Sequence, residues 1–389
     1  MKNIIYNGCD LLGTQKADAL LAGRRLGLVT NMSGVTRIGN QLRTTASVMA
    51  EKYNLAALFG PEHGIRGAAQ AGGSDGDSYL DPETGVPVYD LFSKKASETD
   101  ELLSGLDALV FDIQDIGVRY YTYQYTMLSA MKLAAAANLP FIVLDRINPQ
   151  NGLRVFGNLI EGNCLSGVGA VKGLPAVPGM TIGELARMFN ELPGVSCELS
   201  VLACEGWRRA FDADDTNQLF VPPSPNMPTL DAIYLYPGTC FFEGTNLSEG
   251  RGTTKPFEVF GAPWLEPQAV IDRINVLPSE TRERFSGVVF RPCAFTPTFH
   301  KYQGELCQGI QLHLADRAKC DAYTLGLYLI CIIRDMYPDV CSFSRFLPHL
   351  VGTRRVLRSN FDPAAYLAQA EREAAEFLPV RDKYLIYDN

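Results

Sequence analysis

Residues 58–67 read Leu58-Phe59-Gly60-Pro61-Glu62-His63-Gly64-Ile65-Arg66-Gly67. An apolar run from Leu55 leads into this stretch and predicts a buried strand that ends near Phe59. Three glycines and a proline then fix the path of a turn, from which Glu62, His63 and Arg66 project. In an open α/β sheet, ligands bind outside the carboxyl ends of the strands. The stretch therefore predicts an α/β fold with a polar site at this strand end; the alternative is a surface turn with three solvated side chains.

The rest of the first half supports this fold class, because short apolar strands alternate with helical segments. Strands are predicted at 26–30, 55–59, 108–113, 141–145 and 199–203, and helices at 41–53, 120–137 and 181–191. The alternation is typical of βαβ units and a mostly parallel, Rossmann-like sheet. Polar residues follow four of these strands: Asn31, Glu62, Asp112 with Gln114 and Asp115, and Asp145 with Arg146.

A proline-rich segment at 221–228 predicts the domain junction, because its four prolines exclude a regular element. We predict a Rossmann-like domain over residues 1–225 and a smaller α+β domain over residues 226–389. The second part contains a glycine-rich loop at 242–252. Its predicted elements are helices near 267–276 and 322–336, strands near 288–295 and 309–314, and a last helix that starts at 362.

Composition excludes several classes of protein. Hydrophobic residues make up 47% and charged residues 20% of the 389 residues, which is typical of packed domains rather than a disordered chain. A formal net charge of −8 argues against nucleic acid as a partner.

The ten cysteines contain no C-x-x-C pair and suit a reducing compartment. The N-terminus lacks the apolar core of a signal peptide, and no run approaches the roughly 20 apolar residues of a membrane span. We expect a cytoplasmic protein without a membrane span, or a secreted one if a native leader has been removed.

Common cofactor motifs are absent from the sequence. Neither G-x-G-x-x-G nor a phosphate-binding P-loop follows the predicted strands, so a nucleotide-dependent enzyme on a Rossmann scaffold is disfavoured. The sequence contains four histidines, no H-E-x-x-H metal motif and no G-x-S-x-G nucleophile motif. We therefore predict no cofactor and no metal site.

The remaining candidates for a functional site are carboxylates, arginines and tyrosines in glycine-rich loops. The acids are Glu62, Asp112, Asp115, Glu243 and Glu249, and the cations are Arg66, Arg119, Arg146 and Arg251. Paired carboxylates beside aromatic faces are typical of a site that cleaves carbohydrate, and the arginines suit a sugar that carries a carboxylate. Two alternatives stay open. Asp112 and Asp115 could instead cap the helix that follows them, and the tyrosines at 120–125 could be a packing face.

The same residues resemble the motifs of a known family. In the first half these motifs are Gly60-Pro61-Glu62-His63-Gly64, Phe111-Asp112-Ile113-Gln114-Asp115 and Tyr121-Thr122-Tyr123. They continue with the proline-rich run 222–229, the segment Tyr236–Cys240 and the loop 243–254. They resemble the bacterial exo-β-N-acetylmuramidases of the NamZ type, and the similarity runs from about Gly27 to Tyr387.

The resemblance implies a Rossmann-like domain joined to a smaller C-terminal domain, with the active site in the cleft between them. It implies release of N-acetylmuramic acid from the non-reducing ends of peptidoglycan fragments during cell-wall turnover and recycling. The family's proposed catalytic glutamate falls on Glu62. Met32 and Pro178 replace histidines that are frequent in the family, which puts the substrate specificity in doubt.

We therefore predict a glycoside hydrolase that acts on N-acetylmuramic acid-containing saccharides or muropeptides, with Glu62 as the general acid. Candidates for the second catalytic group are Asp112, Asp115, Glu243 and Glu249. The residues expected to bind substrate are Asn31, His63, Arg66, Gln114, Arg119, Tyr121, Glu243, Asn246 and Arg251, with Arg119 and Arg251 holding the lactyl carboxylate. The alternative function is a non-catalytic binder or sensor of cell-wall fragments.

Overall fold

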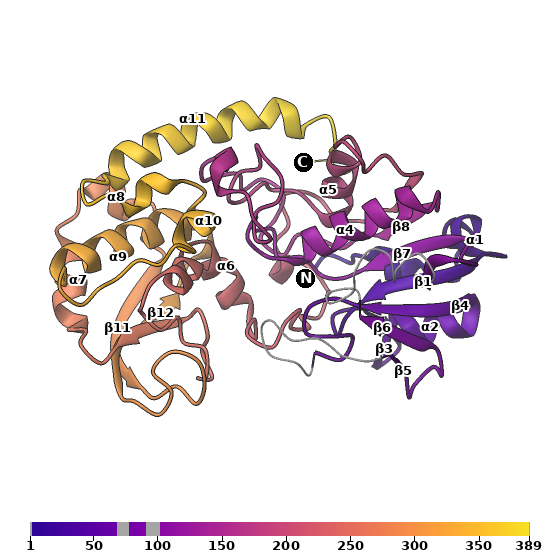
Figure 1. The fold of residues 1–389 in the computed structure, drawn as a ribbon, viewed down its shortest axis with the longest axis horizontal. Helices are drawn as coiled ribbons and strands as arrows, with labels where there is room; N and C mark the ends of the chain where they lie inside the picture. Colours follow the sequence, from indigo (N-terminus) through magenta and orange to yellow (C-terminus); the bar gives the residue numbers. More distant parts are fainter. Residues whose placement is uncertain (1, 68–77, 91–101, 389) are drawn as a thin grey trace.

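The computed structural model describes residues 2–67, 78–90 and 102–388. Figure 1 shows two lobes side by side. The N-terminal lobe is built around a seven-stranded sheet and the C-terminal lobe around a three-stranded sheet. The last helix, α11 (Pro363–Arg381), runs along the top of the view from the C-terminal lobe toward the N-terminal lobe (Figure 1).

The large sheet is mostly parallel. Its strands, in spatial order, are β5 (Tyr79–Leu80), β6 (Pro87–Asp90), β4 (Asn54–Gly60), β1 (Arg25–Thr30), β7 (Ala108–Asp112), β8 (Phe141–Leu144) and β9 (Leu199–Leu202). Only the β5–β6 pair is antiparallel among these described strands. Strands β4, β5 and β6 lie on one side of β1, and the later strands β7, β8 and β9 lie on its other side. The carboxyl ends of β1 and β7 therefore flank the topological switch point, where open α/β sheets bind ligands.

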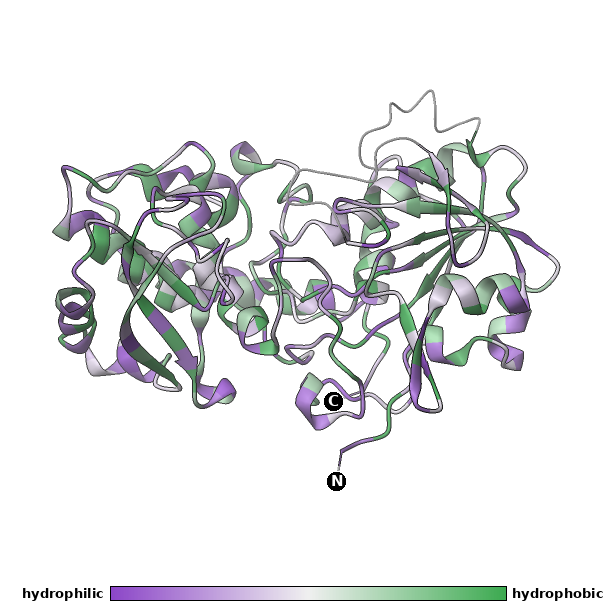
Figure 2. Ribbon diagram, turned by 90° about the horizontal axis from the view of Figure 1, so that it is seen from below, coloured by the Kyte–Doolittle hydropathy of each residue, from purple (hydrophilic) through white to green (hydrophobic). Residues whose placement is uncertain are grey.

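Each central strand is apolar on both faces, because helices cover both sides of the sheet. In β7, Val110 packs into one hydrophobic cluster, while Leu109 and Phe111 pack into the other. Helices α1 (Gln15–Leu21) and α2 (Thr45–Lys52) contribute to the first cluster, and α4 (Tyr123–Ala136) and α5 (Ile182–Phe189) to the second. Figure 2 shows the strands of this sheet coloured mainly as hydrophobic.

The C-terminal lobe places helices against a small antiparallel sheet. The sheet order is β10 (Val259–Ala262), β12 (Cys307–Leu314) and β11 (Val288–Phe295). The helices are α6 (Leu230–Thr239), α7 (Pro267–Asn275), α8 (Ser279–Glu283), α9 (Ala322–Met336), α10 (Leu347–Val351) and α11. Helices α6 and α9 touch through glycines, since a Cβ built on Gly326 would lie 2.4 Å from the Cα of Gly238.

A single hydrophobic cluster continues from the N-terminal lobe into the C-terminal lobe. The ring of Tyr120 lies 5.8 Å from the rings of both Tyr236 and Phe241, and its hydroxyl donates to the carbonyl of Pro237. The two lobes therefore share a packed interior.

The expected fold class is confirmed: a mostly parallel Rossmann-like sheet is joined to a smaller lobe with an antiparallel sheet. The helix predicted at 41–53 was wrong at its start. Residues Gln41–Thr44 form strand β3, which pairs with β2 (Val35–Ile38), and α2 begins at Thr45. The hydroxyl of Thr44 caps α2 by accepting a hydrogen bond from the amide of Ser47 at 3.1 Å. The domain boundary between residues 225 and 226 stays a prediction.

All ten cysteines lie in the described ranges and are unpaired. Seven are buried: Cys9, Cys164, Cys204, Cys240, Cys307, Cys320 and Cys331. Among the described helices, none is both long and apolar enough to cross a membrane.

Candidate active site

Glu62 lies in a tight turn directly after β4. The amide of Gly64 donates to the carbonyl of Pro61 at 2.9 Å and closes the turn. His63 and Gly64 both have φ of 72°, a left-handed conformation that is uncommon for a residue with a side chain. Such backbone conformations cluster at functional sites, where the surrounding structure maintains them. The turn thus holds Glu62 in one defined position at the carboxyl edge of the sheet.

Thr122 contacts the Glu62 carboxylate. Its hydroxyl donates to Glu62 Oε2 at 3.1 Å. Thr122 is the N-cap residue of α4, yet its side chain makes no capping hydrogen bond to the helix. The hydroxyl is therefore used to position Glu62 rather than to stabilise the helix end.

A cavity of about 200 Å³ lies at Glu62, between the two lobes. The lining residues from the N-terminal lobe and the proline-rich segment are Glu62, His63, Tyr120, Tyr121, Thr122, Tyr123, Val168, Ser224, Asn226 and Met227. The C-terminal lobe contributes Tyr236, Cys240, Glu243, Arg251, Phe257, Phe346 and Leu350. We refer to this space as the Glu62 cavity.

Aromatic rings form a continuous wall across the Glu62 cavity. Tyr121 packs edge-on against Tyr123, with ring centroids 5.2 Å apart, and against Tyr236 at 5.9 Å. Tyr236 in turn packs edge-on against Phe257 at 4.8 Å. Edge-to-face pairs of this kind are favourable and hold the rings in place. At one end of the wall the Tyr123 hydroxyl donates to the backbone carbonyl of Glu62 at 3.5 Å, and at the other end the guanidinium of Arg251 lies over the Phe257 ring, 5.2 Å from its centroid.

Arg251 is held between two carboxylates. Its Nη2 lies 2.7 Å from Glu243 Oε1, and its Nε lies 3.2 Å from Glu249 Oε1. Arg251 and Glu243 line the cavity, whereas Glu249 is fully buried and does not. Glu249 therefore orients Arg251 from outside the cavity.

The carboxyl of Glu249 stays ionised despite its burial. Burial acts to raise its pKa, but the interactions with His300 and Lys301 and the charge of Arg251 outweigh burial and lower the pKa to about 2. A permanent anion cannot donate a proton near neutral pH, so Glu249 is unsuited to act as an acid.

Asp112 and Asp115, two other candidates for the second catalytic group, do not line the Glu62 cavity. Asp112 is completely buried and accepts two hydrogen bonds from Arg146, at 2.6 and 2.9 Å. Asp115 accepts a hydrogen bond from the amide of Gly117 at 2.7 Å, and burial raises its pKa to about 7. Neither residue caps α4, whose N-cap is Thr122, so the capping alternative was wrong.

Arg119 cannot bind a substrate carboxylate as expected. It is completely buried, and its guanidinium donates to the backbone carbonyls of Asn158, Leu174, Leu350 and Val351. These carbonyls belong to both lobes. Arg119 therefore joins the lobes and is not available to a ligand.

Asn246 and Asn31 hold backbone segments and do not line the Glu62 cavity. The side chain of Asn246 donates to the carbonyl of Val340 at 2.8 Å and accepts from the amide of Ser342 at 2.9 Å. The side chain of Asn31 donates to the carbonyl of Pro223 at 2.9 Å.

Two further expected substrate-binding residues also lie outside this cavity. Arg66 forms ion pairs with Asp81 and Glu83. The side chain of Gln114 donates to the carbonyl of Ile147 at 3.0 Å and lines a separate cavity. Of the thirteen expected site residues, the structure brings together Glu62, His63, Tyr121, Glu243 and Arg251.

Several residues that line the Glu62 cavity are not among the site residues expected from the sequence. Thr122, Ser224, Asn226 and Tyr236 stand inside the family motifs quoted above, which was a usable signal. Phe257 carries no such signal; it has a φ of 62° and reaches the wall only through folding of the C-terminal lobe. Within the described part of the chain, no cluster of three or more His, Cys, Asp or Glu side chains could hold a metal ion.

Comparisons with known proteins identify the family of this chain. Residues 26–231 match the family "Exo-beta-N-acetylmuramidase NamZ, N-terminal", and residues 234–387 match "Exo-beta-N-acetylmuramidase NamZ, C-terminal". The peptidoglycan β-N-acetylmuramidase NamZ of Bacillus subtilis (strain 168) is 44% identical over 374 residues, covering 94% of this chain and 88% of that protein.

Two crystal structures of DUF1343 family proteins from Bacteroides fragilis NCTC 9343 have the same fold. One has a TM-score of 0.86 and 33% identity over 100% of both chains, and the other a TM-score of 0.76 and 31% identity over 99% of both. Since the two family models together span nearly all of the sequence, this chain belongs to the exo-β-N-acetylmuramidase NamZ family.

Proposed function

We propose that this protein is an exo-β-N-acetylmuramidase that releases terminal, non-reducing β-linked N-acetylmuramic acid from peptidoglycan fragments. The observation that carries this proposal is the Glu62 cavity, in which a positioned carboxyl and an arginine lie at the two ends of one aromatic wall. Family membership supports the same reaction.

In this proposal Glu62 is the general acid. It protonates the glycosidic oxygen as the bond to the sugar breaks, which is the step that a carboxylic acid performs in most glycosidases. A water molecule supplies the hydroxyl group that joins the anomeric carbon, and its proton restores the acid. The Thr122 hydroxyl, 3.1 Å from Glu62 Oε2, fixes the orientation of the carboxyl group. The aromatic wall packs against the apolar face of the sugar ring.

Arg251 is the proposed partner of the lactyl carboxylate that distinguishes N-acetylmuramic acid from N-acetylglucosamine. Among the described residues it is the one arginine that lines the Glu62 cavity. A guanidinium pairs strongly with a carboxylate because it can donate two parallel hydrogen bonds. Glu249 keeps this guanidinium oriented while the substrate carboxylate interacts with it.

Glu243 is the best placed of the four candidates for the second catalytic group. It lines the Glu62 cavity, whereas Asp112, Asp115 and Glu249 do not. Its carboxylate can stabilise the positive charge that develops on the sugar as the glycosidic bond breaks.

The test is hydrolysis of the β-N-acetylmuramide of N-acetylglucosamine, a disaccharide whose alcohol leaving group needs protonation, by the wild type and by Glu62→Gln. Glu62→Gln keeps the shape of the side chain but removes the proton donor, so turnover is expected to fall by at least about a hundredfold. Glu376→Gln, on the exposed surface of α11, is the matched control and keeps full activity.

Two results would contradict the proposal. Equal turnover by Glu62→Gln and wild type would exclude Glu62 as the general acid. Wild-type binding of the muramide without any hydrolysis would favour a sensor of cell-wall fragments over an enzyme.

A further inference from the structure

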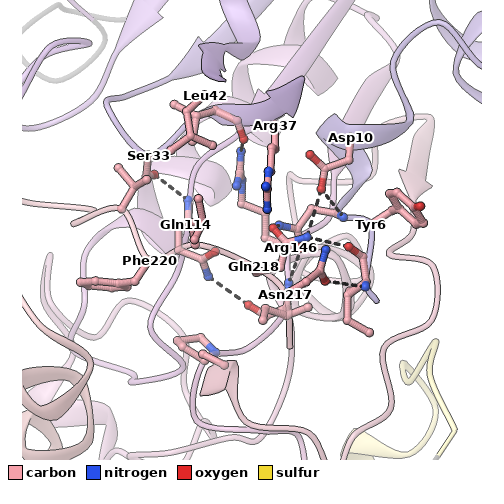
Figure 3. Close-up of a pocket in the computed structure, with 18 of the residues that line it drawn as sticks. Tyr6, Asp10, Ser33, Arg37, Leu42, Gln114, Arg146, Asn217, Gln218 and Phe220 are labelled. Atoms are coloured by element: carbon pink, nitrogen blue, oxygen red, sulfur yellow. Dashed lines mark hydrogen bonds between the residues drawn. The ribbon is translucent and has the colours of Figure 1, made fainter. Parts of the chain in front are cut away.

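A second cavity, of about 320 Å³, lies in the N-terminal lobe and shares no lining residue with the Glu62 cavity. Figure 3 shows it in close-up. Its walls come from the N-terminal segment, the β2–β3 hairpin, the loops after β1, β7 and β8, and residues 213–221, with Leu230 of α6 added from the C-terminal lobe. We refer to it as the switch-point cavity.

The position of this cavity follows from the order of the strands. Ser33 follows β1 and Gln114 follows β7, and the amide of Gln114 donates to Ser33 Oγ at 3.0 Å. The strand order reverses between β1 and β7, so the cavity opens where doubly wound folds bind their ligands. The muramidase chemistry proposed for Glu62 makes no use of it.

Three cations, Lys2, Arg37 and Arg146, and two carboxylates, Asp10 and Asp214, line this cavity. Arg146 is neutralised by Asp112, and Asp214 is paired with Arg317. Asp10 accepts hydrogen bonds from Thr36 Oγ1, the amide of Asn7 and Gln218 Nε2.

Arg37 and Lys2 are the remaining lining cations, and both are exposed. Arg37 uses its Nε to donate to the carbonyl of Gly39 at 3.1 Å. The two terminal nitrogens of its guanidinium donate to no atom of the described residues. Both are therefore available to donate hydrogen bonds to a ligand carboxylate.

The other lining groups complement an amide and an apolar group. The side-chain hydrogen bonds of Gln114 use its Nε2 and that of Asn217 uses its Oδ1, so within the described ranges Gln114 Oε1 accepts no hydrogen bond and Asn217 Nδ2 donates none. Leu42 and Leu219 also line the cavity and are 39% and 58% exposed, which leaves apolar surface next to these polar groups. Apolar walls with a few placed polar groups are typical of small-molecule sites.

We propose that the switch-point cavity is a second ligand site, which takes a small molecule with one carboxylate, one secondary amide and an apolar side chain. N-acylated amino acids and short peptides have this chemistry. Arg37 pairs with the carboxylate, Gln114 Oε1 accepts from the amide N–H, and Asn217 Nδ2 donates to the amide carbonyl. Leu42 and Leu219 contact the apolar side chain.

The test is an NMR titration of the whole protein with N-acetyl-L-leucine, with N-acetyl-L-leucine methylamide as the uncharged comparison. Arg37→Gln is expected to weaken binding of the acid about tenfold, because one charge-assisted hydrogen-bonded contact is lost. The methylamide is expected to bind wild type as weakly as the acid binds Arg37→Gln. Arg282→Gln is the matched control, since Arg282 is also exposed and also uses its Nε to donate to a backbone carbonyl at 3.1 Å.

Binding of the acid is expected to persist in Glu62→Gln, and Arg37→Gln is expected to hydrolyse the muramide at the wild-type rate. The inference is overturned if wild type shows no saturable binding, or if Arg37→Gln binds the acid as tightly as wild type. Competitive inhibition of muramide hydrolysis by the acid would also overturn it, because the probe would then occupy the Glu62 cavity. None of these results depends on whether Glu62 is the general acid.

Discussion

At the scale of single residues, Arg251 is the side chain on which substrate selectivity is expected to depend. Arg251→Gln removes the cation at the end of the aromatic wall, while Lys301 still forms an ion pair with Glu249 at 3.1 Å. The ratio of kcat/KM for the muramide to that for the matching N-acetylglucosaminide is expected to fall about tenfold to a hundredfold.

The control for Arg251 is Arg66→Gln. Arg66 follows the Glu62 turn, but it pairs with Asp81 and Glu83 and does not line the Glu62 cavity. This variant is expected to keep the wild-type ratio. If Arg251→Gln also keeps it, the lactyl carboxylate is recognised by another group.

Asp115 gives the protein a measurable dependence of stability on pH. Its pKa is raised by burial to about 7 in the folded protein, against about 3.9 in an unfolded chain. Between these pH values the folded state retains a proton that the unfolded state has released. The free energy of unfolding therefore falls as the pH rises through this range.

Asp115→Asn carries no ionisable group at this position, so its free energy of unfolding is expected not to show this fall with pH. Relative to wild type, the variant gains up to about 4 kcal/mol in the free energy of unfolding between pH 4 and pH 8. Urea unfolding at pH 4 and pH 8 measures the difference. Burial also raises the pKa of Asp145, to about 6, but this contributes equally to both proteins. Parallel pH profiles of variant and wild type would contradict the prediction.

At the scale of structural elements, the Glu62 turn requires a left-handed backbone at Gly64. Gly64→Ala is expected to cost about 1 kcal/mol of stability, because a Cβ is unfavourable at positive φ. It is also expected to lower kcat for the muramide at least about tenfold, since small displacements of a catalytic group slow the reaction.

Gly85→Ala separates these two effects. Gly85 has a φ of 70°, and a Cβ built there meets no atom within 4 Å. The same loss of stability is expected from thermal unfolding, with kcat unchanged. If the two variants have the same kcat, the conformation of the Glu62 turn does not control catalysis.

The elements also show how far the sequence could predict this structure. Strands β1, β4, β7 and β8 were predictable because strands buried on both faces are continuous apolar runs. The position of Glu62 at the carboxyl edge of the sheet was predictable because the Glu62 turn directly follows one of these strands. The strand at Gln41–Thr44 was not, because it forms by pairing with β2 rather than from its own apolar pattern.

Residues whose environment comes from distant segments were the least predictable. Arg119 was expected to bind substrate because it stands next to the tyrosine motif. Two of the carbonyls that bury its guanidinium, those of Leu350 and Val351, are more than two hundred residues away in the sequence. Tyr236 and Phe257 reach the aromatic wall from the other lobe for the same reason.

At the scale of the whole molecule, the shared hydrophobic cluster is expected to make the two lobes unfold together. Arg119 reinforces this connection by bonding carbonyls of both lobes, and the amide of Ile386 bonds Glu184 of α5 at 2.9 Å. Scanning calorimetry is expected to show one transition, with the calorimetric and van't Hoff enthalpies equal. Two resolved transitions would show that the lobes are independent.

The unpaired cysteines are distributed over both lobes, and this makes them natural reporters of transient opening. A buried thiol reacts with an alkylating reagent only when its surroundings open, so its labelling rate measures the local free energy of opening. Cys9 and Cys204 report on the N-terminal lobe and Cys307 and Cys331 on the C-terminal lobe, without any engineered label. A saccharide bound in the Glu62 cavity, in contact with both lobes, should therefore slow alkylation of all four thiols together.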